Sequence, residues 1–116
     1  MNVVVTGSIA YDYLMSFPGR FAEHILPDQI EHLSVSFLVD EMRRQRGGCA
    51  ANIAYNLALL GERPRVMGAA GQDFGEYRVW LEQHGVDTAL IRTEPDLFTA
   101  SFFVSTDRDG NQIASF

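Results

Sequence analysis

The sequence predicts an α/β fold in which helices flank a parallel sheet and a small additional β-sheet lies on one edge. Two observations lead to this fold class. Strand-like apolar runs alternate along the chain with segments of helical periodicity, which is typical of parallel α/β sheets. Residues 98–116 show a hairpin pattern, and in two segments serine alternates with apolar residues. These segments lie outside the succession of strands and helices, so they predict the additional sheet.

The first 40 residues predict three strands and one interrupted helical segment. The run "NVVVTGS" is typical of a buried strand that ends in a glycine turn, and "YDYLMSF" predicts a second strand at about 12–17. Pro27 interrupts residues 20–33, so we expect a short helix, a break, and a further turn or short helix. Serine alternates with apolar residues in "SVSFLV", which predicts a half-exposed strand at about 34–39.

The stretch "RGGCAANIAYNLALLG" predicts a helix that follows a glycine pair. Ile53, Leu57 and Leu60 recur on one helical face, alanines form a neighbouring stripe, and Gly61 ends the helix. After it, "PRVMGAAG" predicts a strand and "DFGEYRVWLEQHG" predicts an amphipathic helix.

The last third of the chain predicts a short edge strand and then a hairpin. "VDTALIRT" is the edge strand, and the hairpin strands lie at about 98–105 and 112–116, joined by an Asp-Gly turn. The sequence stops inside the second hairpin strand. This predicts that residues 1–116 are the N-terminal part of one longer domain.

Composition and charge exclude several classes of function. The chain of 116 residues has a formal net charge of -6, which argues against nucleic-acid binding because phosphate contacts need a basic surface. The one basic cluster, Arg43, Arg44 and Arg46, is expected to be a solvated stretch. No apolar run reaches the roughly 20 residues of a membrane span. A single cysteine, Cys49, favours a reducing cytoplasm, and three isolated histidines show no metal-binding spacing.

The glycine pair Gly47-Gly48 and the nearby Asn52 form the first candidate site. A glycine pair lets backbone approach a ligand closely, and amide groups of the first helical turn face that ligand. The Asn52 side chain both donates and accepts hydrogen bonds, which suits a neutral polyol such as ribose. Without further information, the residues alone favour a tight turn and a surface asparagine over a ligand site.

The motif "GGCAANIAYNLALLG" resembles the N-terminal signature of the ribokinase-like (PfkB-type) sugar and nucleoside kinases, and "VTGSIAYD" resembles their first strand. Together with "FPGRF", "SVSFLVD", "GAAGQDFGEYRVWL" and "IASF", these segments are most similar to the adenosine kinases of actinobacteria. The resemblance covers nearly the whole chain. It implies a ribokinase-like fold with a small β-sheet lid, formed by the strands expected at 12–17, 34–39, 98–105 and 112–116.

The resemblance also implies a set of nucleoside-binding residues. They are Ser8, Asp12, Ser36, Gly47, Gly48, Asn52, Phe102 and Phe116. Asp12 would accept hydrogen bonds from the ribose hydroxyls, and Phe102 and Phe116 would stack on the base. Phenylalanines in an alternating strand are otherwise core residues. Because Phe102 and Phe103 face opposite sides of the sheet, only one of them can meet the ligand.

The implied activity is transfer of the γ-phosphoryl group of ATP to the 5′-hydroxyl of adenosine, giving AMP as in purine salvage. Magnesium would assist the transfer, and dependence on K⁺ stays open. The second family signature, of the form Asp-Thr-x-Gly-Ala-Gly-Asp, is absent from residues 1–116. The catalytic base and the ATP site are therefore expected downstream of Phe116. An apolar lid face predicts a homodimer formed through the lid.

Two alternative functions remain open at this point. One is a ribokinase-like kinase for another nucleoside or for a sugar such as ribose or fructose 6-phosphate. The ribokinase branch has asparagine where this chain has Ala10, which favours the nucleoside branch. The other alternative is a non-catalytic nucleoside-binding protein.

Overall fold

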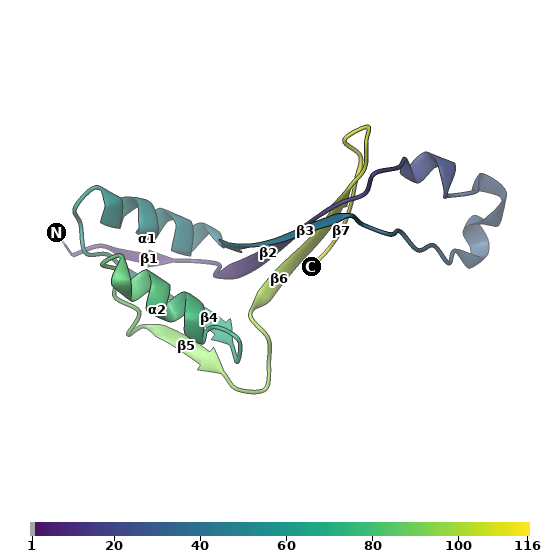
Figure 1. Cartoon of the computed structure of the whole chain (residues 1–116). Coiled ribbons are helices and arrows are strands. Elements are labelled where there is room, and N and C mark those ends of the chain that lie inside the picture. The colour runs from purple at the N-terminus through teal and green to yellow at the C-terminus, as the bar shows by residue number, and fades with distance from the viewer. Residues whose placement is uncertain (1) are drawn as a thin grey trace. The chain divides into compact units, whose positions relative to one another are not determined.

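The computed structural model describes residues 2–116, which form seven strands, two α-helices and two 3₁₀ helices. In chain order these elements are β1 Val4–Thr6, β2 Ala10–Ser16, η1 Phe21–Glu23, η2 Pro27–His32, β3 Glu41–Gly47, α1 Cys49–Leu59, β4 Arg65–Gly71, α2 Gly75–Gln83, β5 Ile91–Glu94, β6 Ala100–Thr106 and β7 Gln112–Ser115 (Figure 1). The chain divides into two compact units. The first comprises residues 2–11 and Arg46–Ser101, and the second comprises Asp12–Gln45 and Phe102–Phe116.

The first unit contains a parallel three-stranded sheet in the order β1-β4-β5. Val66 on β4 and Ile91 on β5 are buried, whereas Val4 on β1 is 49% exposed. The parallel α/β prediction is therefore confirmed. The prediction that the first strand is buried was wrong, because β1 lies at the edge of this sheet.

Helix α1 forms where the glycine pair predicts it, and Gly61 follows it with a φ of 94°. Its buried residues are alanines: Ala50, Ala51 and Ala54. Ile53, by contrast, is 52% exposed. Small side chains let the helix pack closely on β1 and β4. The alanine stripe, rather than the stripe of larger apolar residues, is thus the face that packs on the sheet.

Helix α2 confirms its prediction, since Phe74, Tyr77 and Leu81 are all buried. The two helices contact each other through Tyr55 of α1 and Trp80 of α2, whose ring centroids are 4.7 Å apart. Aromatic pairs at this spacing add about 0.5–1.5 kcal/mol beyond their buried area.

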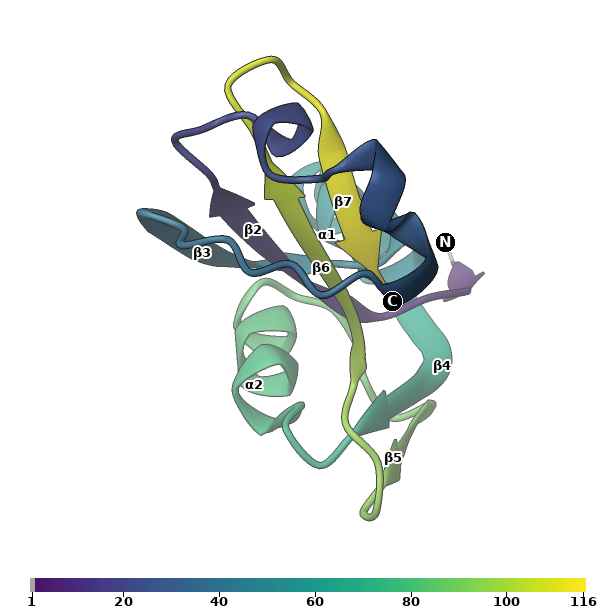
Figure 2. The same cartoon turned by 90° about the vertical axis from the view of Figure 1, so that its right-hand side faces the viewer.

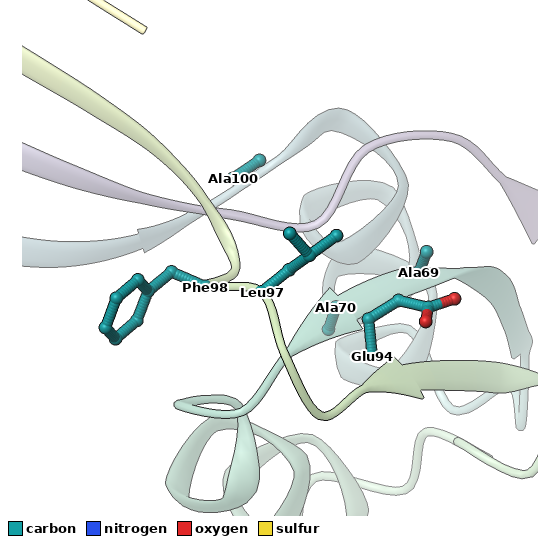
Figure 3. Close-up of a pocket in the computed structure, with 6 residues that line it drawn as sticks. All are labelled: Ala69, Ala70, Glu94, Leu97, Phe98 and Ala100. Carbon is teal, nitrogen blue, oxygen red and sulfur yellow. The ribbon is translucent and has the colours of Figure 1, made fainter.

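A pocket of about 250 Å³ lies near the ends of β4 and β5. Its lining residues are Ala69, Ala70, Glu94, Leu97, Phe98 and Ala100 (Figure 3). The lining is mostly apolar, and the Phe98 ring points away from the other five side chains. Its single carboxylate, on Glu94, is paired with Arg92. None of the residues that the sequence predicts to bind a ligand lines this pocket.

The second unit contains most of a four-stranded sheet in the order β3-β2-β6-β7 (Figure 2). Strands β6 and β7 form the predicted antiparallel hairpin, with Phe103 opposite Ser115 and Thr106 opposite Gln112. Gly110 in the turn has a φ of 80°, a conformation that favours glycine. The hairpin and the strand at 12–17 are therefore confirmed, with ends that shift by one or two residues.

The predicted strand at 34–39 was wrong, and β3 at Glu41–Gly47 takes its place. Val35, Phe37 and Val39 are half-buried while their neighbours are exposed, so the alternation is present without strand pairing. Hydrogen bonding to β2 begins only at Asp40, whose N–H donates to the Ser16 carbonyl at 3.1 Å.

Strand β3 carries the arginine cluster, and every residue before Gly47 is exposed, as predicted for this cluster. The strand lies at one edge of the sheet, where charged side chains protect unpaired backbone from aggregation. Such a strand has no apolar pattern by which the sequence could reveal it.

The segment between β2 and β3 forms the two short 3₁₀ helices, with Pro27 in the first position of η2. The predicted break at this proline is confirmed. Phe17, Phe21 and Phe37 pack together, with ring centroids 4.8–5.5 Å apart. This cluster anchors η1 and the irregular segment that contains Ser36.

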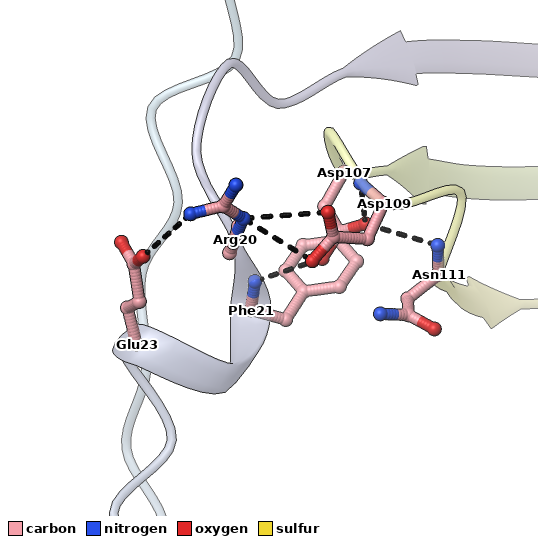
Figure 4. A network of polar contacts seen from close by, with 6 residues as sticks. All are labelled: Arg20, Phe21, Glu23, Asp107, Asp109 and Asn111. Atoms are coloured by element: carbon pink, nitrogen blue, oxygen red, sulfur yellow. Dashed lines mark hydrogen bonds and ion pairs between the residues drawn. The ribbon is translucent and has the colours of Figure 1, made fainter.

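Asp107 connects the hairpin turn to η1 (Figure 4). Its Oδ2 accepts a hydrogen bond from the Phe21 N–H at 2.9 Å, and its Oδ1 accepts bonds from the N–H groups of Asp109 and Asn111, both at 2.9 Å. Burial raises the pKa of the Asp107 carboxyl, but the hydrogen bonds from Phe21, Asn111 and Asp109 outweigh it and hold the pKa below its ordinary value. Asp107 is thus a buried carboxylate whose charged form joins two segments.

We expect Asp107→Asn to lower the melting temperature of the protein, because one amide N–H₂ would face a backbone donor where a carboxylate oxygen now accepts. A carboxyl with a depressed folded-state pKa stabilises the fold above its unfolded pKa, and this contribution is lost as the pH falls through the folded-state pKa. The difference in melting temperature between wild type and variant should therefore shrink below about pH 4.

The matched control for this prediction is Asp109→Asn in the same turn. Asp109 pairs with Arg20 on the surface, with both side chains about half exposed. Surface pairs contribute little, so this variant should unfold close to the wild-type temperature. Thermal unfolding across a pH series measures both effects, and equal losses in the two variants would contradict the role given to Asp107.

Candidate functional site

The glycine pair forms a sharp elbow between the end of β3 and the start of α1. Gly48 is the N-terminal cap of α1 and has a φ of 96° and a ψ of 133°. A Cβ atom at this position would lie 2.5 Å from the Ser8 carbonyl oxygen and 2.6 Å from the Ile9 Cα. The elbow therefore touches the β1–β2 connection backbone to backbone, which only glycine permits.

Ser8 holds the start of α1. Its Oγ accepts a hydrogen bond from the Cys49 N–H at 2.9 Å, and its carbonyl oxygen accepts one from the Ala50 N–H at 3.1 Å. These bonds satisfy two of the N–H groups that a helix leaves unpaired at its N-terminus. The family resemblance places Ser8 among the nucleoside-binding residues but does not indicate this contact, which joins residues 41 positions apart.

Asn52 lies on the first turn of α1 with an exposed side chain. Its N–H donates to the Gly48 carbonyl at 3.0 Å, and its carbonyl accepts a bond from the Asn56 side chain at 2.8 Å. Ser8, Gly47, Gly48 and Asn52 are thus brought together in the first unit. The backbone of Asn52 serves the helix, and its amide side chain faces solvent beside the elbow.

Three further residues from the sequence analysis share one face of the four-stranded sheet. Tyr13 and Phe103 stack at 4.6 Å with an interplanar angle of 12°, so they lie on the same face. Successive strand residues point to opposite faces, which places Asp12 and Phe102 together on the other face. Phe116 stacks on Phe102 at 5.0 Å and 28° and belongs to that face too.

Ser36 is the residue that the structure does not join to this set. It is exposed, in the irregular segment before β3. Its neighbour Phe37 packs inward on Phe17 and Phe21. With no strand at 34–39, the strand-based reason for placing Ser36 on the lid sheet does not hold.

One contact at the elbow comes from the helix that the sequence predicts only as amphipathic. Tyr77 of α2 donates its hydroxyl hydrogen to the Gly47 carbonyl oxygen at 2.9 Å. Helical periodicity shows that Tyr77 faces inward, but it does not show which group the hydroxyl binds.

Within the described residues 2–116, no group of three or more histidine, cysteine, aspartate or glutamate side chains is arranged to hold a metal ion. No helix in that range is long and apolar enough to cross a membrane.

A parallel α/β unit with a glycine elbow at a helix start, continued by a small β-sheet, defines the ribokinase-like class of fold. More particularly, the chain belongs to the pfkB family of carbohydrate kinases, whose family pattern matches residues 3–116.

Two relatives are nucleoside kinases. The enzyme of Methanothermobacter thermautotrophicus is 34% identical over 117 residues, which cover 99% of this chain and 35% of that protein. The nucleoside kinase of Burkholderia thailandensis in its ligand-free form is 48% identical, with a TM-score of 0.80 over 98% of this chain and 38% of that one. Its complex with inosine gives 44% identity and a TM-score of 0.77, over 98% of this chain and 35% of that one. The chain thus spans about a third of the length of the relatives it matches.

Proposed function

We propose that this chain is the nucleoside-binding part and lid of a longer kinase that transfers the γ-phosphoryl group of ATP to the 5′-hydroxyl of a purine nucleoside, with adenosine as the first candidate. The observation that carries the proposal is the shared face of Asp12, Phe102 and Phe116 in a member of the pfkB family. A carboxylate suits a vicinal diol, and two rings suit a flat base. The nucleoside kinase relatives support the same substrate class.

In this proposal each of these side chains and backbone groups has one task in holding the acceptor. The Asp12 carboxylate accepts hydrogen bonds from the two ribose hydroxyls, which are charge-assisted and about twice as strong as neutral ones. The Gly48 N–H and the Asn52 side chain bind the same sugar, and the base packs against Phe102 and Phe116. Holding the 5′-hydroxyl in one orientation is the main contribution this chain makes to the reaction rate.

The remaining chemistry is assigned to the part of the kinase outside residues 1–116. Phosphoryl transfer needs a base for the hydroxyl proton and positive charge for the phosphates. We assign the Mg²⁺ that would neutralise charge on the phosphates to that part of the kinase as well. ATP as donor follows from the proposal that this is a kinase of the family.

We also propose that the lid sheet pairs with a second copy of the chain. Phe103 and Ile113 lie on the face opposite Asp12 and are 43% and 44% exposed. Tyr13 stacks on Phe103 on the same face, and a second copy covering this face would remove these apolar side chains from water.

A substrate panel tests the proposed function. The complete protein with ATP and Mg²⁺ should phosphorylate adenosine and inosine much faster than ribose or fructose 6-phosphate, and residues 1–116 alone should show no transfer. Preference for a free sugar would favour a sugar kinase. Tight nucleoside binding without any transfer by the complete protein would favour a non-catalytic binding protein.

We expect Phe102→Ala to raise the KM for adenosine while leaving the KM for ribose unchanged. A base–aromatic stack contributes about 1–3 kcal/mol, which corresponds to roughly a 5- to 150-fold change. Phe103→Ala is the matched control, because this ring lies on the opposite face, against Tyr13. Steady-state kinetics with both substrates measure the ratio. Equal losses for adenosine and ribose in the Phe102 variant would reject stacking as its role.

A further inference from the structure

The Tyr77 hydroxyl is fixed in place by the aromatic residues around it. The residue is 1% exposed, and its ring packs against Phe74 at 5.4 Å and Tyr11 at 5.5 Å between centroids. From this position it donates to the Gly47 carbonyl oxygen at 2.9 Å. The ring cannot turn away without disturbing its neighbours, so the hydroxyl is a rigid donor to the elbow.

The Gly47 carbonyl and the Gly48 N–H belong to the same peptide group. A trans peptide is planar, and its C=O and N–H bonds point in opposite directions, so fixing one fixes the other. A peptide between two glycines is otherwise free to rotate as a unit, because neither residue has a Cβ to restrict it. The bond from Tyr77 therefore determines where the Gly48 N–H points.

Other contacts hold the same elbow from both sides. The Ser8 Oγ accepts from the Cys49 N–H immediately after Gly48. Arg46, immediately before Gly47, forms an ion pair with Glu76 and lies over the Trp80 ring at 4.8 Å. Helix α2 thus contacts two successive residues at the end of β3. Of these contacts, the hydrogen bond from Tyr77 is the one made to the peptide group between the two glycines.

We propose that Tyr77 is a positioning residue for the acceptor, which keeps the Gly48 N–H directed toward a hydroxyl of the bound sugar. This inference rests on the proposed function, in which Gly48 binds the sugar through that N–H. The hydrogen bond to the Gly47 carbonyl also polarises the peptide, which makes its N–H a stronger donor. Tyr77 itself does not touch the substrate in this arrangement.

The test is Tyr77→Phe in the complete protein, with Tyr11→Phe as the matched control. Tyr11 is also 1% exposed and donates its hydroxyl to a backbone carbonyl, that of Asp73 at 3.2 Å. Each variant loses a hydrogen bond from a buried tyrosine to a backbone carbonyl, so their melting temperatures should fall by similar amounts. Only Tyr77→Phe should raise the KM for the nucleoside, by about 5- to 30-fold, while the KM for ATP stays unchanged.

Hydrogen exchange supplies a second readout that does not depend on activity. The Cys49 and Ala50 N–H groups are bonded to Ser8, so a loosened elbow should expose them. Their exchange should accelerate in Tyr77→Phe and not in Tyr11→Phe.

The outcomes separate this inference from the proposed function. If the parent protein phosphorylates nucleosides and Tyr77→Phe has an unchanged nucleoside KM, the positioning role is wrong while the proposed function stands. Equal KM changes in both tyrosine variants would also overturn it. If the parent phosphorylates no nucleoside, the proposed function fails. Unchanged exchange at Cys49 and Ala50 would then overturn the elbow contact as well.

Discussion

Asp12→Asn is expected to lower kcat/KM for the nucleoside by about 100-fold or more, the largest loss of activity from any single change near the site. The carboxylate accepts a hydrogen bond from each of two neighbouring hydroxyls in our proposal, and each charge-assisted bond contributes about 1.5–3 kcal/mol. Asparagine has the same shape but only one acceptor oxygen. The change should therefore leave the strand intact while removing a large part of the sugar-binding energy.

A double-mutant cycle with modified substrates makes this prediction specific. Wild type should lose activity when the nucleoside lacks the 2′-hydroxyl. Asp12→Asn should lose much less activity from the same change of substrate, because the carboxylate that binds this hydroxyl is already absent. Asp40→Asn is the control, since Asp40 is exposed and lies immediately before β3. If the loss from Asp12→Asn and the loss from removing the 2′-hydroxyl are additive, the Asp12 side chain does not bind the diol.

Gly48→Ala is expected to reduce the free energy of unfolding by more than about 3 kcal/mol. Two effects combine at this position. A φ of 96° is a conformation that L side chains rarely adopt, and the added Cβ would lie 2.5–2.8 Å from backbone atoms of residues 8–10. Backbone cannot move aside as the end of a flexible side chain can, so the elbow and the β1–β2 connection would have to separate.

Gly61→Ala separates the two effects. Gly61 has a φ of 94°, close to that of Gly48, but a Cβ there meets nothing within 4 Å. This variant should show the backbone strain alone, about 1–2 kcal/mol. Urea denaturation of both variants measures the difference. A similar loss at Gly48 and Gly61 would show that the close approach of the elbow to residues 8–10 is not a constraint on the fold.

The elements with local signals were predictable from the sequence. Gly61 and Gly85 follow α1 and α2 in left-handed conformations, and Gly110 turns the hairpin. Each signal acts over a few residues, which is why the helices and the hairpin were predicted nearly to their observed ends. Strand β3 has no such signal, because every residue before Gly47 is exposed and apolar residues do not alternate along it.

The site was predictable in its residue types but not in its supporting contacts. Asp12, Phe102 and Phe116 came from a family resemblance, and their shared face depends on the pairing of β2 with β6, which no local pattern encodes. Ser8 is separated from its partner at the elbow by 41 positions in the sequence, and Tyr77 is separated from its partner by 30. Such contacts depend on how α1 and α2 pack, and the periodicity of α1 did not show that its alanines rather than Ile53 would be buried.

The measurement that tests the account most directly is a crystal structure of the complete protein with adenosine bound. We predict that both ribose hydroxyls lie within about 3 Å of the Asp12 carboxylate oxygens, that the Gly48 N–H donates to the sugar, and that the adenine ring packs on Phe102 and Phe116. A nucleoside held elsewhere, with its ribose away from Asp12 and Gly48, would contradict the account.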